Sequence, residues 1–372
     1  MKALFLVFHG FQEYNGISKK IKYQIHALQQ CGIEMHACYY DVTLDRHRQW
    51  LVDGKVIKDF GTGTIAKIKK RVDFRAIIHY VLSQKIDWVY LRYYHNSNPF
   101  TIHLLETLRK ANVRILLEIP TYPYDQEYSS FNKSVVYIDR LFRHSLCKQA
   151  NAIVTFSNEK EIFGQRTIRI SNGIDFEHIP LRQTLHDTSQ ELHLIGVAEI
   201  HFWHGFDRLI KGLALYYRSN PTYKVYFHMV GSPFGERERQ ELEKPIQTYG
   251  LQPYIFLHGA QHGQDLDELF EKADFAVGSL ARHRSGIDRI KTLKNREYAA
   301  RGFGFIYSET DDDFEQMPYI LKAPADESPI DISALIEFCK NPSSTPQEIR
   351  ASIRHLSWQE QMKKVYDYMK KP

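Results

Sequence analysis

Residues 2–40 have the sequence KALFLVFHGFQEYNGISKKIKYQIHALQQCGIEMHACYY, and this stretch decides the fold. Its first part, Ala3–Phe8, is a continuous apolar run of the kind that forms a strand buried on both faces. From Ile17 the apolar residues recur at helical spacing, and Gly32 closes that pattern as a glycine after a helix does. Residues 34–40 return to a strand-like pattern. A strand, a helix and a second strand in this order predict parallel strands joined by a crossover helix.

The same alternation continues along the chain in two series. In the first series, apolar, β-rich runs separated by helix-length segments occur at residues 86–91, 113–119 and 152–156. In the second series they occur at residues 192–198, 224–230, 254–257, 275–277 and 303–307. Strands that alternate with helices indicate a parallel sheet covered on both faces. We therefore expect an α/β protein with two doubly wound, Rossmann-like domains.

The boundaries of these domains follow from composition. Residues 172–189 contain few large apolar side chains and include Pro180, which is typical of a linker. We expect an N-terminal domain at residues 1–178 and a C-terminal domain at residues 179–356. Residues 357–372 begin with Ser357 and have Glu360 three positions later, which predicts a capping box and a final helix. We expect this helix to pack back on the N-terminal domain.

Composition excludes several classes of protein. No apolar run approaches the roughly 18 residues of a membrane-spanning helix, and the four cysteines show no CxxC pairing that would indicate a zinc site or a disulfide framework. The formal net charge of +5 divides into +8 for residues 1–180 and −3 for residues 181–372. No Lys/Arg block of nucleic-acid type is present, so no nucleic-acid partner is expected. A reduced, cytoplasmic protein is the expectation.

Polar and aromatic residues follow the expected strands of the first domain. Ligands of open α/β sheets bind outside the carboxyl ends of the strands, so residues there are candidates for function. One strand is followed by LRYYHNS (91–97), and the next ends in EIPTYPYDQE (118–127). Carboxylates bind sugar hydroxyls and aromatic faces stack on sugar rings, although a structural loop packed by tyrosines has the same composition. The candidates for binding an acceptor are Arg92, His95, Glu118, Tyr122, Asp125 and Glu127.

Glycines and cations follow the strands of the second domain. A glycine follows each of two strands, and residues 282–296 hold a run of cations. Glycine, imidazole and guanidinium groups beside a helix start suit a diphosphate, whereas a solvated basic surface is the alternative. The candidates here are His204, Gly231, His283, Arg284, Gly286, Arg289 and Lys294.

The turn before the first helix, Asn15-Gly16-Ile17-Ser18, offers main-chain N–H groups at a helix start, which favour an anion or a hydroxyl. It does not match the GxGxxG fingerprint, so a dinucleotide site is not supported. A strand-to-helix turn that simply needs Gly16 is the alternative.

Four segments in this order resemble glycosyltransferase family 4, the retaining nucleotide-sugar transferases of the GT-B fold. They are Gly16-Ile17-Ser18, SNGID (171–175), WHGFDRL (203–209) and LKNREYAARG (293–302). EIPTYPYDQE further resembles a subgroup found in bacterial capsule and exopolysaccharide gene clusters. The resemblance implies two Rossmann-like domains facing a central cleft. It also implies transfer of a sugar from a nucleoside diphosphate to an acceptor hydroxyl, with retention at the anomeric carbon.

The resemblance implies roles for single residues. Glu297 matches the second glutamate of the family's Glu-x7-Glu pattern, which holds the ribose hydroxyls of the nucleotide. His204 stands where many members have a lysine that contacts the diphosphate. His283, Arg284 and Gly286 match the loop that surrounds the phosphates and the donor sugar.

Gly231 matches a glycine that lines the nucleotide pocket, and Gly16 lies in the loop that approaches the donor phosphate. The first glutamate of the pattern is missing, because its position holds Arg289 and the neighbouring Asp288 offers the nearest carboxylate. Glu199 stands at the position of the family's phosphate-binding arginine, so other arginines must neutralise the charge of the phosphates. The catalytic set implied by the resemblance is Glu297, His204, Arg284 and Asp288. The implied donor-binding set is Gly16, Gly231, His283, Gly286, Arg289 and Lys294.

The resemblance implies a reaction without a cofactor or a metal, because GT-B relatives use basic side chains and helix N-termini to stabilise the leaving diphosphate. A UDP-sugar is the commonest donor, and a lipid-linked or oligosaccharide acceptor is expected. The basic, amphipathic stretches at residues 67–71 and 140–148 suit the anionic inner leaflet of a membrane, although solvated helix faces have the same pattern. The alternative function is a catalytically weak or inactive GT-B subunit that binds a sugar nucleotide or a partner transferase.

Overall fold

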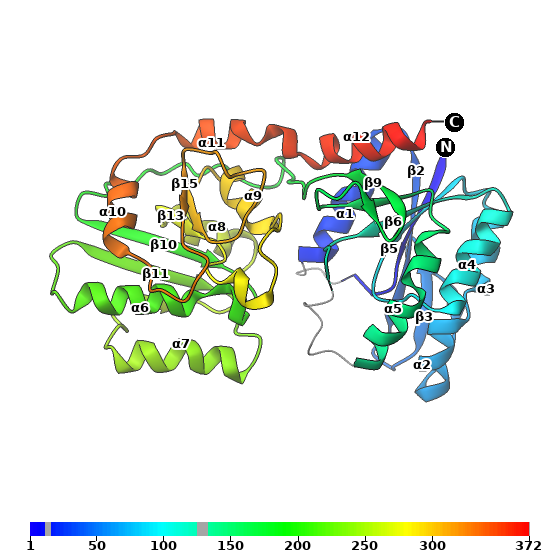
Figure 1. The fold of residues 1–372 in the computed structure, drawn as a ribbon, viewed down its shortest axis with the longest axis horizontal. Coiled ribbons are helices and arrows are strands. Elements are labelled where there is room, and N and C mark those ends of the chain that lie inside the picture. The colour runs from blue at the N-terminus through cyan, green and yellow to red at the C-terminus, as the bar shows by residue number, and fades with distance from the viewer. Residues whose placement is uncertain (12–15, 125–132, 372) are drawn as a thin grey trace. The chain divides into compact units, whose positions relative to one another are not determined.

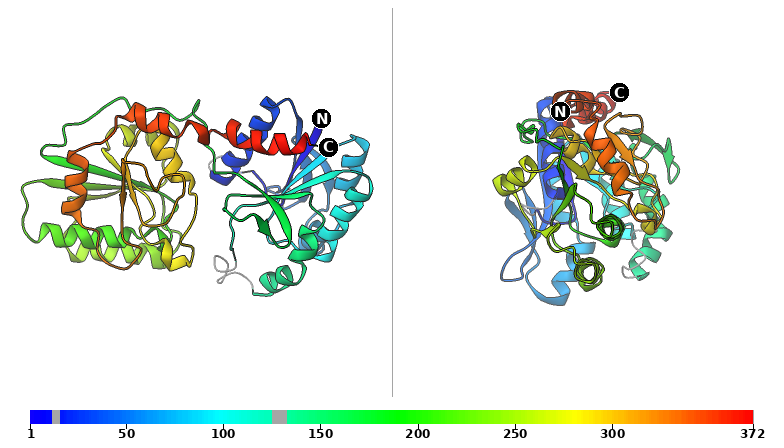
Figure 2. Two further views of the ribbon diagram at one scale, coloured as in Figure 1. Left: turned by 45° about the horizontal axis from the view of Figure 1, so that its top comes forward. Right: turned by 90° about the vertical axis from the view of Figure 1, so that its left-hand side faces the viewer.

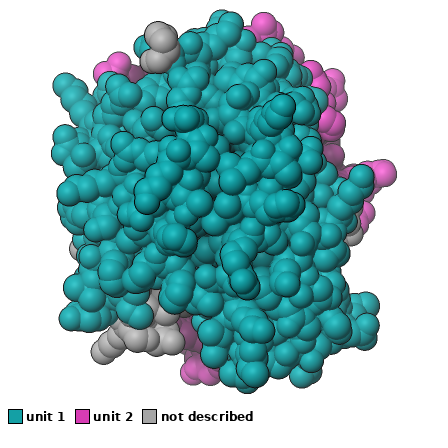
Figure 3. Space-filling model, turned by 90° about the vertical axis from the view of Figure 1, so that its right-hand side faces the viewer, with its two compact units in different colours: residues 1–173, 358–372 teal, residues 174–357 magenta. Residues whose placement is uncertain are grey.

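The computed structural model describes residues 1–11, 16–124 and 133–371. The acceptor candidates Asp125 and Glu127 lie outside the described residues. The chain divides into two compact units, coloured teal and magenta in Figure 3. Unit 1 consists of Met1–Gly173 and Trp358–Pro372, and unit 2 is the continuous segment Ile174–Ser357.

Unit 1 contains a nine-stranded sheet with the order β4-β3-β2-β1-β5-β6-β7-β9-β8 (Figure 1). The six inner strands from β2 to β9 run parallel, and the hairpins at the two edges pair antiparallel. The strands are β1 (Lys2–Val7), β2 (Glu34–Val42), β3 (Arg48–Val52), β4 (Lys55–Asp59), β5 (Trp88–Arg92), β6 (Arg114–Ile119), β7 (Ala152–Thr155), β8 (Glu161–Ile162) and β9 (Gln165–Arg169).

Helices cover this sheet on both faces, as Figure 2 shows from two further directions. Strand β1 explains the arrangement, because its residues from Ala3 to Val7 are all buried and need partners on either side. The helices are α1 (Gly16–Gln30), α2 (Gly63–Val72), α3 (Arg75–Ser83), α4 (Pro99–Lys110), α5 (Lys133–Cys147) and α12 (Trp358–Met369). Within the described part of the chain, no helix combines the length and the apolar character needed to cross a bilayer.

Unit 2 contains a six-stranded, all-parallel sheet with the order β12-β11-β10-β13-β14-β15. The strands are β10 (Glu191–Val197), β11 (Lys224–Val230), β12 (Ile255–Leu257), β13 (Phe275–Val277), β14 (Phe305–Tyr307) and β15 (Ile320–Lys322). The helices are α6 (Phe206–Tyr217), α7 (Glu236–Thr248), α8 (Gly263–Glu271), α9 (Leu293–Ala300), α10 (Ile332–Lys340) and α11 (Pro346–Ser352). Two short 3₁₀ turns, η1 (Phe202–His204) and η2 (Arg282–Ser285), follow β10 and β13.

Two hydrophobic cores lie on opposite faces of the unit 2 sheet. One contains apolar side chains of α6, α7 and α10, and the other contains those of α8, α9 and α11. The expectation of two doubly wound α/β domains is therefore confirmed. The sequence did not predict the β3–β4 hairpin, whose turn residues Asp53 and Gly54 have φ angles of 49° and 81°.

Helix α12 returns the chain to unit 1, where it lies beside α1 (Figure 1). Trp358, at its start, is 4% exposed and covers Gly173, where an added Cβ would lie 2.4 Å from the indole ring. The side chain of Gln361 accepts a hydrogen bond of 2.7 Å from the main-chain N–H of Ser171. The glycine of the SNGID segment therefore provides the space that the helix needs.

Trp358→Ala is expected to lower the free energy of unfolding by about 3–5 kcal/mol, because it removes a buried indole from a close-fitting contact. Urea denaturation followed by circular dichroism measures the change. Lys363→Ala, on the exposed side of the same helix, is the control and should stay within about 0.5 kcal/mol of the wild type. Equal losses for the two variants would contradict the packing role of Trp358.

Candidate functional site

A cavity of about 470 Å³ lies at the carboxyl ends of β1, β2, β5 and β6 in unit 1. Its lining consists of residues that follow these strands and of the start of α1: His9, Gly10, Phe11, Ile17, Ser18, Tyr40, Asp41, Val42, Arg92, Tyr93, Tyr94, His95, Pro120, Thr121 and Tyr124. Of the acceptor candidates, Arg92 and His95 belong to this lining, whereas Glu118 and Tyr122 do not. The candidate Gly16 immediately precedes the lining residue Ile17.

Glu118 is fully buried at the end of β6. Its carboxylate accepts hydrogen bonds from Tyr90 at 2.6 Å, from Gln24 at 2.7 Å and from Arg92, and the Lys20 ammonium lies 3.9 Å away. Burial has the largest effect and opposes ionisation, but these partners outweigh it, so that the pKa of Glu118 is lowered. Glu118 therefore fixes Arg92 at the edge of the cavity.

Aromatic rings line the neighbouring part of the cavity, and a buried carboxylate, Asp139, holds two of them. Tyr93 and Tyr124 both donate to the buried Asp139, and Tyr93 also exchanges a hydrogen bond of 3.0 Å with Ser97. The ring of His95 stands edge-on to Tyr124, with the centroids 4.7 Å apart. Burial raises the pKa of both tyrosines, so they remain neutral hydroxyls that hold the loops together.

Tyr122 packs edge-on against Phe163, with ring centroids 5.4 Å apart. This contact places it in the aromatic packing beside the cavity. His9, at the end of β1, lies within the cavity lining, and burial lowers its pKa, with a further lowering by the charge of Arg92. The cavity thus combines a neutral imidazole, a fixed guanidinium and tyrosine faces.

In unit 2, glycines allow loops to approach one another at the carboxyl edge of the sheet. Gly231, directly after β11, has a φ of 124°, and a Cβ there would lie 1.6 Å from the carbonyl oxygen of Ala198. Gly205 has a φ of 64°, and a Cβ there would meet Ala281 at 2.6 Å. The segments that follow β10, β11 and β13 therefore pack against one another at this edge of the sheet.

A cluster of ionisable side chains occupies this place. Lys294, in the first turn of α9, has a buried Nζ atom without a hydrogen-bond partner among the described residues. Burial lowers its pKa to about 7. His204 is 7% exposed, and burial together with the charges of Lys294 and Arg282 holds its pKa well below 6.5. The imidazole is therefore neutral beside Arg282 and Lys294.

Glu309 adds a carboxylate to this cluster from the segment after β14. It is 2% exposed, and neither carboxylate oxygen has a hydrogen-bond partner among the described residues. Burial raises its pKa to about 7, although the charge of Lys294 acts in the opposite direction. Sequence reasoning missed Glu309, and the available signal was its position two residues after an apolar strand.

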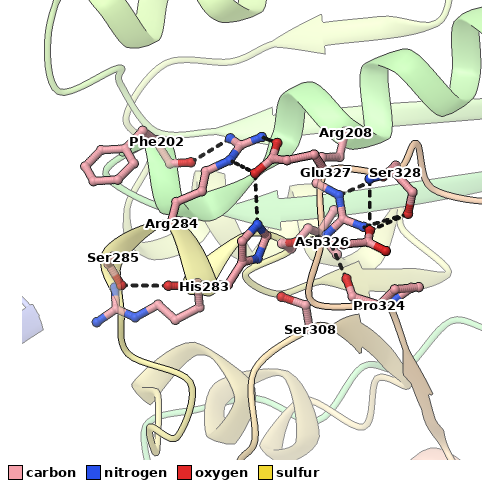
Figure 4. A network of polar contacts seen from close by, with 12 residues as sticks. Phe202, Arg208, His283, Arg284, Ser285, Ser308, Pro324, Asp326, Glu327 and Ser328 are labelled. Atoms are coloured by element: carbon pink, nitrogen blue, oxygen red, sulfur yellow. Dashed lines mark hydrogen bonds and ion pairs between the residues drawn. The ribbon is translucent and has the colours of Figure 1, made fainter.

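Arg284 belongs to a separate network (Figure 4). Its guanidinium makes two hydrogen bonds to Asp207, at 2.8 and 3.0 Å, two to Glu327 and one to the carbonyl oxygen of Phe202. These carboxylates raise the pKa of Arg284, and Arg284 in turn lowers the pKa of Glu327 to about 2. His283 also contacts Glu327, at 2.9 Å. Arg284 and His283 therefore hold the segment 282–286, which ends at Gly286, against α6.

Arg208 also fixes the loops around the segment 282–286. It is fully buried and donates to the carbonyl oxygens of Ser328, Pro324 and Leu280. It connects the first turn of α6 to the loops after β13 and β15. The Asp-Arg pair of the WHGFDRL segment thus acts as a scaffold for the loops, with Asp207 holding Arg284.

Glu297 lies in α9, three residues after Lys294, and is held by Arg301, with Nε 3.1 Å from Oε1. The next residue, Tyr298, accepts from the Val197 N–H and donates to the Val277 carbonyl, both at 3.0 Å. Tyr298 therefore fixes this helix to the ends of β10 and β13. The side chain of Glu297 is 31% exposed.

Asp288 and Arg289 are both exposed, and Arg289 pairs with Asp312. Their main chain bridges to Thr310, with the Thr310 N–H 2.7 Å from the Asp288 carbonyl. Neither side chain belongs to the buried cluster around Lys294.

No family model matches the chain, and no curated protein sequence matches it. Sucrose-phosphate synthase from Thermosynechococcus elongatus has a similar structure, with 12% identity, a TM-score of 0.68 and coverage of 99% of this chain and 98% of that chain. HepE from Anabaena in complex with UDP has 15% identity, a TM-score of 0.64 and coverage of 99% of each chain. The catalytic domain of starch synthase IV from Arabidopsis thaliana, bound to ADP and acarbose, has 13% identity and a TM-score of 0.66 over 99% of this chain and 98% of that chain. These neighbours are GT-B glycosyltransferases, and the chain has the GT-B fold.

Glu118→Gln is expected to lower the free energy of unfolding by about 3–5 kcal/mol at pH 7, because it leaves Arg92 and Lys20 buried without their anion. The pKa of Glu118 is lowered from 4.5 in the folded protein, so its contribution is complete above pH 4.5 and is lost as the pH falls through the folded value. The difference between wild type and variant should therefore shrink below pH 4.5. Urea denaturation at pH 7 and at pH 4 measures both effects.

The exposed Glu159 provides the control, and Glu159→Gln should have little effect at either pH. A difference between wild type and Glu118→Gln that stays constant from pH 7 to pH 4 would contradict an ionised Glu118.

Proposed function

We propose that the protein is a glycosyltransferase that moves a sugar from a nucleoside diphosphate to the hydroxyl of an acceptor. The observation that carries the proposal is the buried Lys294 ammonium, which lacks a hydrogen-bond partner among the described residues and lies with Arg282 and His204 at the carboxyl edge of a GT-B unit. A buried amine without hydrogen bonds costs free energy, and the charge of Glu309 offsets this only in part, so the oxygens of a diphosphate would supply the missing acceptors.

The nucleotide is proposed by analogy with the structural neighbours. HepE structures contain UDP and UDP-glucose, starch synthase IV was bound to ADP, and a trehalose-6-phosphate synthase structure contains UDP-2-fluoro-glucose. A UDP-sugar is therefore the first donor to test and an ADP-sugar the second. Glu297 is proposed to accept the ribose hydroxyls, since its carboxylate is partly exposed and lies on the same helix as Lys294.

In the proposed mechanism, Lys294 and Arg282 stabilise the charge that develops on the leaving diphosphate. The neutral imidazole of His204 contributes a hydrogen bond instead of a charge. Arg284, whose donors are occupied by Asp207 and Glu327, acts as a positioning residue for the loop that bears Arg282. We propose transfer with retention, in which the departing phosphate takes the proton of the acceptor hydroxyl, so that neither a metal ion nor a separate base is required.

The acceptor is proposed to bind in the unit 1 cavity, where Arg92 and His95 contact its polar groups and tyrosine faces stack on its sugar rings. A lipid-linked glycan of a bacterial surface polysaccharide is the proposed acceptor. The surface of unit 1 supports this choice. Ile65 and Ile68 of α2 are 69% and 57% exposed among lysines, and Leu141 of α5 is 58% exposed beside the exposed Arg140. These exposed apolar and basic residues suit an anionic leaflet.

A second candidate is an inactive GT-B subunit that binds a sugar nucleotide without turnover. The observation that favours it is the exposed position of Asp288 and Arg289, away from the buried cluster. Hydrolysis of a UDP-sugar, or transfer from it to added acceptors, separates the two functions. Nucleotide binding without turnover on any acceptor would favour the inactive subunit.

Lys294→Met is expected to weaken the binding of UDP or ADP at least tenfold, because it removes the unpartnered cation from the proposed phosphate site. Isothermal titration calorimetry measures the affinity, and EDTA should leave it unchanged. Lys272→Met removes an exposed lysine of the same unit and is the matched control. If the wild type binds neither nucleotide, the proposed function is wrong.

Ile65→Glu and Leu141→Glu are each expected to reduce binding to vesicles that contain phosphatidylglycerol at least fivefold, because each places an anion in the apolar and basic surface. Co-sedimentation with vesicles measures binding, and 0.5 M salt should weaken it through screening at about a 4 Å Debye length. Leu185→Glu changes a residue of unit 2 that is 65% exposed and should have no effect. Equal effects of all three substitutions would contradict a lipid-binding surface on unit 1.

A further inference from the structure

The segment that follows β14 contains five carboxylates between residues 308 and 315. Four of them have cationic partners in unit 2: Asp311 and Asp313 bind Arg296, Asp312 binds Arg289, and Glu315 binds Lys322. Glu309 differs, because both of its oxygens are buried and, among the described residues, no side chain donates a hydrogen bond to them; its own main-chain N–H is the one group that acts on its charge as a donor. The chain places the charges of Lys294 and Arg282 near Glu309 but leaves most of its hydrogen-bonding capacity unused.

The position of Glu309 is fixed by its main chain. The Ser308 N–H donates to the Ser279 carbonyl at 2.9 Å, and the Thr310 N–H donates to the Asp288 carbonyl at 2.7 Å. The Lys322 ammonium also donates to the carbonyl oxygen of Glu309. Because Ser308 and Thr310 are both hydrogen-bonded to the segment after β13, the main chain of Glu309 is fixed at the carboxyl edge of the sheet.

A buried carboxylate without hydrogen bonds is unfavourable, so a partner that donates hydrogen bonds would stabilise it. The raised pKa of Glu309 has the same origin, since burial penalises its charged form. The positive charges that act on Glu309 are those of Lys294 and Arg282. The chemistry that satisfies the whole cluster is a molecule with anionic groups for the cations and neighbouring hydroxyls for the carboxylate.

We propose that Glu309 accepts hydrogen bonds from the hydroxyls of the sugar ring of the donor and thereby selects the sugar. This inference rests on the proposed function, because the ligand is a nucleoside diphosphate sugar whose phosphates lie at Lys294 and Arg282. Asp288 and Arg289, at the position of the missing first glutamate, are both exposed and lie outside the buried cluster, whereas Glu309 belongs to it. Paired hydrogen bonds from ring hydroxyls to one carboxylate discriminate between epimers, because a buried acceptor left unpaired is costly.

The test compares a nucleotide with its sugar conjugates. Isothermal titration calorimetry gives the dissociation constants of the full chain for UDP, UDP-glucose, UDP-galactose and UDP-N-acetylglucosamine, and for ADP and ADP-glucose. In the wild type, at least one sugar conjugate should bind tenfold more tightly than its free nucleotide. In Glu309→Gln, that sugar-dependent gain should fall at least fivefold, whereas binding of the free nucleotide should be retained although the charge beside Lys294 changes.

Retained binding of the free nucleotide shows that the variant is folded. Glu309→Asp keeps the charge but withdraws the carboxylate by one methylene, so it should lose the sugar-dependent gain as well. Glu315→Gln is the matched control, because Glu315 follows the same strand but is paired with Lys322 and Tyr307. Its ratio of conjugate affinity to nucleotide affinity should equal that of the wild type.

Three results would overturn the inference. They are a wild type that binds no conjugate more tightly than the nucleotide, a sugar-dependent gain that survives in Glu309→Gln, and an equal loss for nucleotide and conjugate. Absence of nucleotide binding by the wild type is a different result, because it contradicts the proposed function itself.

Discussion

Parallel strands need a crossover connection, and this requirement places the functional groups of both units. When each strand is followed by a helix, all strands of a parallel sheet end at the same edge. The strands themselves are buried on both faces, so polar side chains collect where the strands end. In unit 2 the segments after β10, β13 and β14 bring His204, Arg282 and Glu309 to one edge although they are far apart in the sequence. Gly231 permits this convergence, because any side chain there would overlap the carbonyl of Ala198.

The fold was predictable because its signals are local. The apolar run of β1, the helical spacing of α1 and the glycine after it identify the repeating unit within forty residues. The β3–β4 hairpin was missed although Asp53-Gly54 is a strong hairpin signal, since both residues adopt positive φ angles in its tight turn. Strand β15 could not be predicted, because it has only three residues and none of them is fully buried, so no apolar run identifies it.

The candidate site was less predictable, because its chemistry depends on partners distant in sequence. Arginine is a residue type that often binds phosphate, but the guanidinium of Arg284 is occupied by the carboxylates of Asp207 and Glu327, which lie 77 and 43 residues away in the sequence. Glutamate is a residue type that often binds sugar hydroxyls, but the carboxylate of Glu118 accepts hydrogen bonds from Arg92 and Gln24, which belong to other elements of the fold. In both cases the residue type indicates a charge, and the three-dimensional structure decides whether that charge is available to a ligand.

The return of α12 to unit 1 has a consequence for biosynthesis. Unit 2 is a continuous segment inserted into unit 1, whose last element follows it along the chain. During translation, all of unit 2 leaves the ribosome before Trp358 can cover Gly173. The nascent first unit must therefore persist with an uncovered apolar surface while its successor is synthesised. The packing of α12 on unit 1 is therefore a late step of folding, which can occur only after the whole of unit 2 has been synthesised.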